Sequence, residues 1–556
     1  MKYIEIKKAS FAYGTEENPV VRQLSVTINH GEFAVIAGSN GSGKSTLLRL
    51  MNGLLLPQEG EVITAGMSTS NPNLILPIRK TTGMVFQNPE NQLSATVVEE
   101  DVAFGPENLA FSSEEMTKAV EEALDLTGLT EQKSRSTTAL SAGQLQRLAL
   151  AGVLAMKPRC LLLDEPTSML NPQARHSFME LIHRLNREKG LTVVMVSHHE
   201  REILSASRLI VMDKGQIVRD GKPKDIMKEE SLEQWGLLPP PSLEAVRHLQ
   251  NRGLSLPETT EEEALTDSLK SLGKEAQTTL WEKFPLLSNR SLKEKDHSLP
   301  IDVQNISHDY LKGTLLKHRA LSEVSLKAAS GECLCLIGTT GSGKSTLLQH
   351  LNGLLLADEG QVSLLNTILG PETRDEEVIS LRRQIGLVMQ RPEKQLFERF
   401  VGDDVAFAPK QAGLTGKKLA RRVKWAMDLA GLPFTQFKDR PIYALSGGEK
   451  RKAALAGVLA LQPRVLLLDE PSAGLDPLSR RELHRILINL REQGTTLVIA
   501  THDMDEAALL GHRIVLMERG KAVMNGSPAQ VFSRGEELRH RGLEPPFIKR
   551  IEEALA

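Results

Sequence analysis

The sequence is poor in cysteine and has no long apolar run, and each absence excludes a class of protein. Its only cysteines are Cys160, Cys333 and Cys335, and the last two alternate with leucine in an apolar stretch typical of a buried strand. We expect core thiols in a reducing compartment, not a disulfide or a metal site. No window approaches the roughly 18 apolar residues of a membrane span, and the opening MKYIEIKKASFAYG lacks the apolar segment of a secretion signal. We therefore expect a protein that is neither secreted nor membrane-spanning.

No charge of either sign dominates the chain. The 68 Lys and Arg residues are balanced by 70 Asp and Glu residues, which leaves a net charge of -2. No global positive field therefore favours nucleic acid as the partner, although a local basic patch is still allowed. With 40% hydrophobic and 25% charged residues, the composition is that of a globular protein that can bury large cores.

What the sequence does contain is an internal repeat. The stretch GSNGSGKSTLLRLMNGLLLPQEGEV, which begins at Gly38, is matched by GTTGSGKSTLLQHLNGLLLADEGQV, which begins at Gly338. Four further pairs follow in the same order: GMVFQNPENQL and GLVMQRPEKQL, LSAGQLQRLALAGVLA and LSGGEKRKAALAGVLA, CLLLDEP and VLLLDEP, VVMVSHH and LVIATHD. The chain is therefore a tandem duplication.

The repeat and the segment between its copies predict the domain organisation. We expect a first domain over residues 1–230 and a Pro-bounded helical module over residues 231–272, which forms the C-terminal part of the first half. A polar linker is expected over residues 273–298, and a second domain over residues 299–556.

Within each half, apolar runs alternate with helical patterns. This alternation predicts an α/β fold in which helices cover a mostly parallel sheet. The runs EFAVIAG and CLLLD are expected to be buried strands. In LSAGQLQRLALAGVLA, the apolar residues from Leu145 to Val153 fall at helical spacing, so we expect a helix to begin just after Ser141.

The stretches GSNGSGKST and GTTGSGKST fit the phosphate-binding loop pattern G-x-x-x-x-G-K-[ST]. Each follows an apolar strand and precedes a helical pattern, which is the context that this pattern requires. Glycines let successive backbone N–H groups face the phosphates, and Lys44 or Lys344 supplies a full positive charge. Ser45 and Ser345 are expected to ligate Mg²⁺. Because both copies are intact, an ordinary glycine-rich turn is a poor alternative explanation.

Two adjacent carboxylates end the apolar run LLLDE in each half. We expect the aspartate, Asp164 or Asp469, to reach the magnesium ion. The glutamate that follows each of them is expected to orient a water molecule in line with the γ-phosphate. His198 and His502, at the end of a further β-rich run, are expected to contact the γ-phosphate. A lone histidine is more often structural, and it is the repeated set of motifs that favours catalysis.

The ordered set of phosphate loop, Gln loop, LSGGE, LLLDEP, GLD and THD resembles an ATP-binding cassette (ABC) ATPase over nearly all of both halves. The resemblance implies an α/β fold of tandem P-loop (RecA-like) nucleotide-binding domains, each with a helical subdomain that carries the LSGG element. It implies that ATP and Mg²⁺ are the cofactors and that Gln87 and Gln390 sense the magnesium ion and the water. It also implies that Tyr13 and Tyr310 stack on adenine, with an ordinary edge-strand aromatic as the alternative.

The residues expected to function fall into three groups. The catalytic group comprises Glu165, Glu470, His198, His502, Gln87 and Gln390. The nucleotide-binding group comprises Tyr13, Gly38, Ser39, Asn40, Gly41, Ser42, Gly43, Lys44, Ser45, Thr46, Ser141, Ala142, Gly143 and Gln144 in the first half, and Tyr310, Gly338, Thr339, Thr340, Gly341, Ser342, Gly343, Lys344, Ser345, Thr346, Ser446, Gly447, Gly448 and Glu449 in the second. The metal group comprises Ser45, Asp164, Gln87, Ser345, Asp469 and Gln390.

In ABC ATPases two cassettes meet head to tail, so each nucleotide lies between the phosphate loop of one and the LSGG helix of the other. The resemblance therefore implies intramolecular pairing of the two cassettes. The site that contains the second phosphate loop departs from the pattern, because its LSGG partner has Ala142 in place of Gly447 and Asn171 in place of Asp476. An alanine costs little if the backbone there is helical and more if it needs positive φ, so this second site is expected to be the slower one.

The stretches VFQNPENQLSATVVEEDVAFGPENL and AGVLAMKPRCLLLDEP, and AGVLA after both LSGG elements, resemble the ATPase pair of energy-coupling factor (ECF) transporters. The resemblance implies the ATP-hydrolysing subunit of an importer of vitamins or of cobalt or nickel ions. The implied partners are an integral membrane scaffold subunit and a solute-binding membrane subunit, and no nucleic acid. The implied location is cytoplasmic, peripheral on the inner face of the cell membrane, with residues 87–93 and 390–396 beside the groove that receives helices of the membrane partner.

Other classes of ABC protein fit the sequence less well. The main alternative is a soluble twin-cassette ATPase that acts on the ribosome, but such factors typically carry NHLD where this chain has SMLN and AGLD. DNA-repair ABC ATPases insert a long coiled coil between the loop lysine and the aspartate, and too little chain separates Lys44 from Asp164. Fused sugar-importer ATPases usually have a damaged second phosphate loop, and a non-hydrolysing role predicts lost lysines or glutamates; neither loss occurs here.

Overall fold

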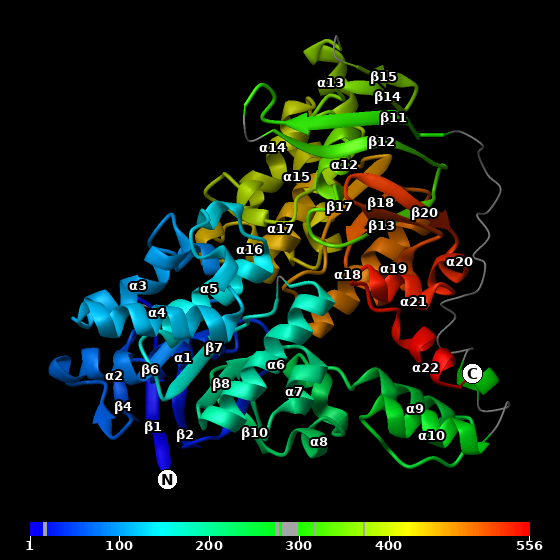
Figure 1. Cartoon of the computed structure of the whole chain (residues 1–556). Coiled ribbons are helices and arrows are strands. Elements are labelled where there is room, and N and C mark those ends of the chain that lie inside the picture. The colour runs from blue at the N-terminus through cyan, green and yellow to red at the C-terminus, as the bar shows by residue number, and fades with distance from the viewer. Residues whose placement is uncertain are drawn as a thin grey trace. The chain divides into compact units, whose positions relative to one another are not determined.

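The computed structural model describes residues 1–14, 19–168, 170–272, 277–280, 299–314, 317–370 and 373–555 (Figure 1). They form two compact units. One comprises Met1–Glu244, Glu258–Glu261 and Asp476–Leu478, and the other Ala245–Pro257, Glu262–Leu475 and Ser479–Ala556. Of the expected linker 273–298, residues 273–276 and 281–298 lie outside the described residues.

The first half contains two sheets. The antiparallel sheet has the strand order β2-β1-β4-β5, and the six-stranded sheet has the order β10-β9-β3-β8-β7-β6, in which β10 runs antiparallel to β9 and the other pairs are parallel. The strands are β1 (Lys2–Phe11), β2 (Val21–Asn29), β3 (Phe33–Ala37), β4 (Glu59–Thr64), β5 (Met67–Ser68), β6 (Thr82–Val85), β7 (Cys160–Asp164), β8 (Thr192–Val196), β9 (Arg208–Asp213) and β10 (Gln216–Gly221). The helices are α1 (Lys44–Met51), α2 (Ile75–Thr81), α3 (Val98–Asn108), α4 (Ser113–Thr127), α5 (Ala142–Leu154), α6 (Pro172–Lys189), α7 (Glu200–Ser205) and α8 (Pro223–Ile226).

Alternate residues of the six-stranded sheet enter two different cores. From β3, Phe33 and Val35 pack with residues of α5 and α6, whereas Ala34 and Ile36 pack on the other face with α1 and the antiparallel sheet. Because both faces are buried, the strands are continuous apolar runs and not alternating ones. The strands predicted from EFAVIAG and CLLLD are confirmed as β3 and β7.

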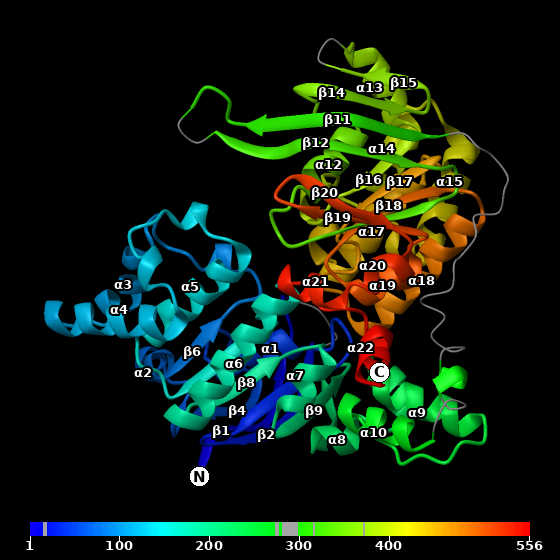
Figure 2. The ribbon, with the colours of Figure 1, turned by 45° about the vertical axis from the view of Figure 1, so that its right-hand side comes forward.

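Three helices of the first half, α3, α4 and α5, pack against one another and form a helical subdomain (Figure 2). Helix α5 begins at Ala142, as predicted. The Ser141 hydroxyl accepts a hydrogen bond from the Gln144 backbone N–H, and the Gln144 side chain accepts one from the Ser141 N–H. This reciprocal capping box fixes the start of the helix that carries the LSAG element.

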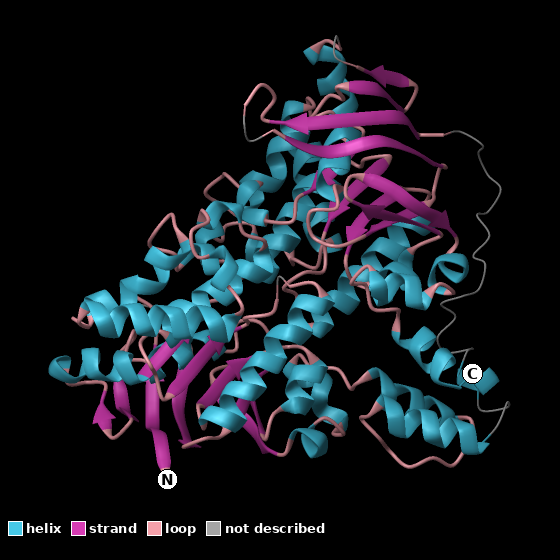
Figure 3. Cartoon of the chain, in the orientation of Figure 1, coloured by secondary structure: helices cyan, strands magenta, loops and turns pink. Residues whose placement is uncertain are grey.

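The second half also contains a four-stranded sheet and a six-stranded sheet, and helices again lie against its strands (Figure 3). Its sheets have the orders β12-β11-β14-β15 and β16-β17-β18-β13-β19-β20, the latter parallel except for β20. The strands are β11 (Ile301–Tyr310), β12 (His318–Ala328), β13 (Cys333–Ile337), β14 (Glu359–Leu364), β15 (Thr367–Leu369), β16 (Ile385–Val388), β17 (Val465–Asp469), β18 (Thr496–Thr501), β19 (Arg513–Glu518) and β20 (Lys521–Gly526). The helices are α12 (Lys344–Leu351), α13 (Asp375–Arg382), α14 (Val401–Gln411), α15 (Gly416–Leu429), α16 (Phe434–Phe437), α17 (Gly447–Leu459), α18 (Pro477–Glu492), α19 (Met504–Leu510), α20 (Pro528–Phe532), α21 (Gly535–His540) and α22 (Phe547–Leu555).

A small helical module is built from two distant parts of the sequence. Helices α9 (Pro241–Asn251) and α10 (Glu262–Leu272) share a hydrophobic cluster with α22, to which Leu249, Leu269 and Ile551 contribute. Arg550 on α22 donates two hydrogen bonds to the Glu262 carboxylate, at 3.1 and 2.7 Å. The last helix of the chain therefore completes the core of the segment that follows the first half.

The three cysteines lie in strands, Cys160 in β7 and the other two in β13, and all three are buried free thiols. The expectation of core thiols is confirmed. No helix among the described residues is both long and apolar enough to cross a membrane.

Candidate functional site

The loop between β3 and α1 has a backbone that only glycine fits at two places. Gly38 and Gly43 have φ of 137° and 98°, and a Cβ added at Gly38 would lie 2.0 Å from the Met212 carbonyl oxygen. In the second half, a Cβ at Gly338 would lie 2.3 Å from the Met517 carbonyl oxygen. The matched loops therefore have matched backbones, which bring their N–H groups around one point at the start of a helix.

The lysine of each loop is buried inside the turn that it closes. Lys44 Nζ donates to the carbonyl oxygens of Gly38 and Ser39, at 2.9 and 2.8 Å, and Lys344 makes the same two bonds in its loop at 2.7 and 3.0 Å. Burial lowers the pKa of both lysines, and the carboxylate of the nearby glutamate acts in the opposite direction. Neither ammonium has a carboxylate ion pair among the described residues, so each can neutralise a bound anion.

A hydroxyl and a buried carboxylate lie together behind each lysine. Ser45 Oγ donates to Asp164 Oδ1 at 2.8 Å. In the second half the Ser345 hydroxyl lowers the pKa of Asp469 against the effect of burial. Burial raises the pKa of both aspartates to about 6. Hard oxygen donors whose charge is costly to bury fit a divalent cation such as Mg²⁺, because the cation would favour the ionised carboxylate.

The glutamate after the first aspartate has two polar neighbours. Glu165 Oε1 lies 3.1 Å from His198 Nε2, and Glu165 Oε2 accepts a hydrogen bond from Gln87 Nε2 at 2.8 Å. Burial alone would raise the pKa of Glu165, but the hydrogen bond and charge of His198 bring it below the ordinary value. The carboxylate is therefore ionised at neutral pH and able to accept a hydrogen bond from water. The structure thus brings together Gln87, Glu165 and His198, three of the residues expected to be catalytic.

The second half reproduces only part of this arrangement. Glu470 Oε2 lies 2.6 Å from His502 Nδ1, and this histidine lowers the pKa of Glu470 against the effect of burial. The Gln390 side chain is exposed, and in the described part of the chain it makes no hydrogen bond to Glu470. Here the structure does not bring the glutamine and the glutamate together.

Two contacts to the glutamate backbone were not predicted. Ser168 Oγ donates to the Glu165 carbonyl oxygen at 3.0 Å in the first half. In the second half Arg451 Nη1 donates to the Glu470 carbonyl oxygen at 2.6 Å. Aligning the two halves gives the signal that points to both residues, because Ala473 replaces Ser168 and Arg451 replaces Gln146 beside otherwise matched motifs.

Each predicted adenine-stacking tyrosine lies beside its phosphate loop. Tyr13 Oη is 3.2 Å from Thr46 Oγ1, and Tyr310 Oη is 3.3 Å from Thr346 Oγ1. Both rings are partly exposed and each rests edge-on against one neighbouring ring, that of Phe11 for Tyr13. An exposed aromatic face next to a phosphate loop can stack on a base.

The two residues that depart from the pattern, Ala142 and Asn171, cause no strain within their own half. Gly447, the counterpart of Ala142, shows what the first of these positions requires. Gly447 is the first residue of α17, has no positive φ, and a Cβ added there would meet no atom within 4 Å. Ala142 begins α5 in the same way, so its methyl group causes no backbone strain. Asn171 caps α6 by accepting a hydrogen bond from the Ala174 N–H at 2.8 Å, a role that Asn and Asp fill equally well. Serine capping also holds in the second half, where Ser446 and Glu449 form a capping box.

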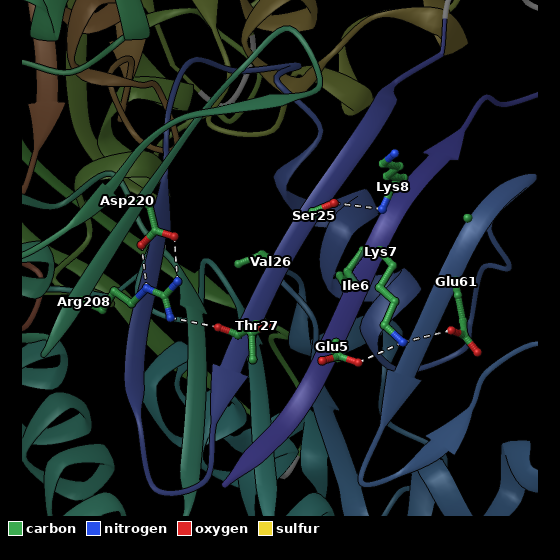
Figure 4. A pocket seen from close by; sticks show the side chains of 11 residues that line it. Glu5, Ile6, Lys7, Lys8, Ser25, Val26, Thr27, Glu61, Arg208 and Asp220 are labelled. Carbon is green, nitrogen blue, oxygen red and sulfur yellow. Dashed lines mark hydrogen bonds and ion pairs between the residues drawn. The ribbon is translucent and has the colours of Figure 1, made fainter.

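A hollow of about 840 Å³ lies on the first antiparallel sheet, away from the predicted site residues (Figure 4). Two ion pairs form within its charged lining: Lys7 Nζ lies 3.3 Å from Glu61 Oε2, and Arg208 Nε donates to Asp220 Oδ1 at 2.6 Å. None of the predicted site residues lines it.

Comparisons with known proteins agree with the repeat. The ABC transporter family model matches residues 21–168 and again residues 321–473. A protein of Caldanaerobacter subterraneus subsp. tengcongensis, named as an ABC transporter ATP-binding protein, is 34% identical over 98% of this chain and 95% of its own length. A similarly named protein of Methanosarcina mazei is 33% identical over 99% of this chain and 93% of its own length. Among solved structures, cbiO1 from Clostridium perfringens, described as part of the ABC transporter complex cbiONQ, is 34% identical, covers 46% of this chain and 99% of its own, and has a TM-score of 0.39.

Proposed function

The chain belongs to the ABC transporter family, and from this premise we propose that it is the ATP-hydrolysing subunit of an importer of the ECF type. Its two cassettes bind and hydrolyse ATP. In this proposal hydrolysis drives uptake of a micronutrient, a vitamin or a cobalt or nickel ion, through separate membrane subunits. The chain then acts at the inner face of the cell membrane, bound to an integral scaffold subunit and through it to a solute-binding subunit. The motifs that resemble the ECF ATPase pair support this finer assignment.

We assign the steps of hydrolysis to matched residues of the two halves. Lys44 neutralises phosphate charge, while Ser45 and Asp164 hold Mg²⁺, which supplies Lewis-acid stabilisation of the phosphoryl group when bound. Glu165 accepts a hydrogen bond from the attacking water and His198 contacts the γ-phosphate. Two observations support these roles: the buried ammonium has no carboxylate ion pair in the described ranges of the chain, and the glutamate is ionised. Lys344, Ser345, Asp469, Glu470 and His502 take the same roles in the second half.

Both composite sites are formed inside one chain in this proposal. The first phosphate loop pairs with the LSGG element at Ser446, and the second with the LSAG element at Ser141. Two complete sets of loop lysine, aspartate and glutamate support a chain that needs no second copy for activity.

The observation that carries the transport proposal is an exposed aromatic surface next to the Gln loop. In the second half Phe397 and Phe407 are 64% and 39% exposed and pack edge to face at 4.7 Å between ring centroids. In the first half Phe104, the counterpart of Phe407, is 50% exposed. Exposed apolar groups gathered beside a functional segment typically mark a protein contact, and we propose that a helix of the membrane partner covers them.

A glutamine in each Gln loop region ties this surface to the LSGG helix. Gln92 Oε1 accepts from the Phe86 N–H at 3.1 Å, and Gln92 Nε2 donates to the Ala149 carbonyl oxygen of α5 at 3.5 Å. Gln395 makes the equivalent bonds, at 3.2 Å to the Met389 N–H and at 3.5 Å to the Ala454 carbonyl oxygen of α17. A partner that displaces the exposed surface would therefore move the loop and the helix together.

The proposal is tested by purifying the tagged chain from membranes in mild detergent and identifying what accompanies it. We expect integral membrane proteins in constant ratio to the chain. Recovery with ribosomes and without membrane protein would instead support the soluble twin-cassette alternative.

A variant separates docking from folding in the same experiment. Replacing Phe397 by Ser, its counterpart at position 94, together with Phe407→Ala, should remove the membrane proteins from the preparation and leave ATP binding intact. Ile368 is 60% exposed on β15, outside the helical subdomain, and Ile368→Ser is the matched control that should change neither. Unchanged co-purification of the Phe397 and Phe407 variant would contradict the proposed docking surface.

A further inference from the structure

The two halves hold the backbone of the catalytic glutamate by different means. Glu165 and Glu470 both have the left-handed conformation, with φ of 46° and 50°, which is strained for a residue with a side chain. In both halves the glutamate N–H donates to the neighbouring strand, at 3.2 Å to the Val196 carbonyl and at 2.9 Å to the Ala500 carbonyl. The carbonyl of each glutamate also accepts from the backbone N–H of the residue three positions further on, at 3.2 Å in both halves. The two halves differ in the side chain that donates to this carbonyl.

In the first half a serine holds this carbonyl, whereas the second half has no hydroxyl at that position. Ser168 Oγ donates to the Glu165 carbonyl at 3.0 Å, and its counterpart is Ala473. In its place Arg451 reaches over from α17. Its Nη1 donates to the Glu470 carbonyl at 2.6 Å and to the Pro471 carbonyl at 2.9 Å.

The same arginine also replaces a missing link to the Gln loop. In the first half the Gln87 side chain bonds directly to the Glu165 carboxylate. In the second half Arg451 Nη2 donates to the Gln390 carbonyl at 2.8 Å. Arg451 thus joins the start of the Gln loop, the glutamate turn and the LSGG helix through one side chain.

The residue at the equivalent place in the first half cannot do this. Gln146 is buried, and its Nε2 has no hydrogen-bond partner among the residues that the structure describes. A guanidinium has five N–H donors in a planar fork, so it can serve three carbonyls at once, which neither an amide nor an ammonium can do in the same geometry. Burial lowers the pKa of Arg451, and the carboxylates of Glu393 and Glu470 act against that effect.

We propose that Arg451 is a positioning residue of the second half, which fixes the turn that carries Glu470 and couples this turn to the Gln loop. The inference rests on the proposed role of Glu470 in hydrolysis. Arg451 takes over in one side chain what Ser168 and Gln87 do in the first half. Loss of Arg451 should therefore misplace the Glu470 carboxylate without disturbing the phosphate loop that binds ATP.

The test measures steady-state ATP hydrolysis in a Glu165→Gln background, where turnover comes from the second half alone. Arg451→Gln should lower kcat about tenfold or more and leave KM within about twofold, because small misplacements of a reacting group are costly while ground-state binding is unchanged. Lys452→Gln is the matched control. It removes a positive charge one residue further along, whose partner Glu482 lies outside the site, and it should leave kcat unchanged.

A rescue distinguishes positioning from a general loss of stability. Adding Ala473→Ser to Arg451→Gln supplies the hydroxyl that the first half uses, and it should restore part of kcat. Arg451→Lys keeps the positive charge but not the planar guanidinium, so its kcat should lie between that of the protein with Arg451 and that of Arg451→Gln.

Three results would overturn the inference: an unchanged kcat in Arg451→Gln, a rise in KM with kcat retained, or no gain from Ala473→Ser. The inference and the proposed function fail in different ways. Adding Glu470→Gln to the Glu165→Gln background should abolish turnover, and if turnover persisted, the proposed role of the glutamate would be wrong whatever Arg451 does.

Discussion

In the nucleotide-free protein, the buried carboxylate of Asp164 should lower the free energy of unfolding of the first half at neutral pH. Burial raises the pKa of Asp164 from 3.8 to about 6, so at neutral pH the ionised carboxylate opposes folding. Because the pKa of Asp164 is higher in the folded state, its contribution to the free energy of unfolding is complete below about pH 4 and is lost as the pH rises through 6. A shift of about two pKa units means that about 3 kcal/mol of this free energy is lost above pH 7.

Asp164→Asn removes this titration and keeps an oxygen for the Ser45 hydroxyl, which donates at 2.8 Å. The free energy of unfolding of the nucleotide-free first half should rise by roughly 1.5 kcal/mol at pH 5 and by about 3 kcal/mol at pH 7.5. For a unit of this size the larger gain raises the midpoint of thermal unfolding by about 6 to 12 °C. Mg²⁺ with ATP should stabilise the wild type far more than the variant, because the carboxylate is a proposed metal ligand.

Differential scanning calorimetry between pH 5 and 8, with and without Mg²⁺ and ATP, measures both effects. Asp469→Asn is the matched variant in the second half, where burial also raises the pKa to about 6, and it should behave alike. A loss of stability in nucleotide-free Asp164→Asn, or a gain that does not change with pH, would refute the reasoning.

Two further changes test other parts of the structure. Arg550→Ala removes the two-bond ion pair that closes the helical module, and it should lower the module's stability by about 1 kcal/mol, seen as faster hydrogen exchange in α10 with little change elsewhere. Equal exchange in α10 would contradict this role. In hydrolysis, Glu165→Gln should remove more turnover than Glu470→Gln, because in the proposed pairing only the second site faces Ala142 and Asn171 in place of a glycine and an aspartate. Neither residue strains its own helix, so the expected loss arises where they meet the nucleotide. The paired change of these two residues to Gly and Asp should raise the turnover left in Glu165→Gln; equal losses and no gain would show that both departures are neutral.

The sequence predicted the parts of the fold that depend on local pattern. The repeat, the strands at EFAVIAG and CLLLD, and the start of α5 after Ser141 all followed from short stretches, because a buried parallel strand and a capped helix have their own residue patterns. The family resemblance named Gln87 and Glu165 as site residues, whereas their contact is a finding of the structure. The cost of Ala142 could not be judged from sequence, since it depended on whether the backbone there is helical, as it is.

The sequence did not predict contacts between residues far apart in the chain. The packing of α22 with α9 and α10 joins segments separated by almost half the protein, and no local pattern encodes it. Arg451 looked like any basic residue on the surface of a helix, and only its reach to the Glu470 and Gln390 carbonyls distinguishes it. Differences between the two copies, such as Ala473 for Ser168, were visible but had no meaning until the structure placed them beside the site.

The most direct test of the account is the number of ATP molecules held by one chain that cannot hydrolyse them. With Glu165→Gln and Glu470→Gln combined, native mass spectrometry at increasing dilution should find a single chain carrying two ATP molecules, because both phosphate loops are intact and the two cassettes are proposed to pair within the chain. One ATP per chain, or a dimer of chains that loses its nucleotide on dilution, would contradict the claim that this protein forms both composite sites by itself.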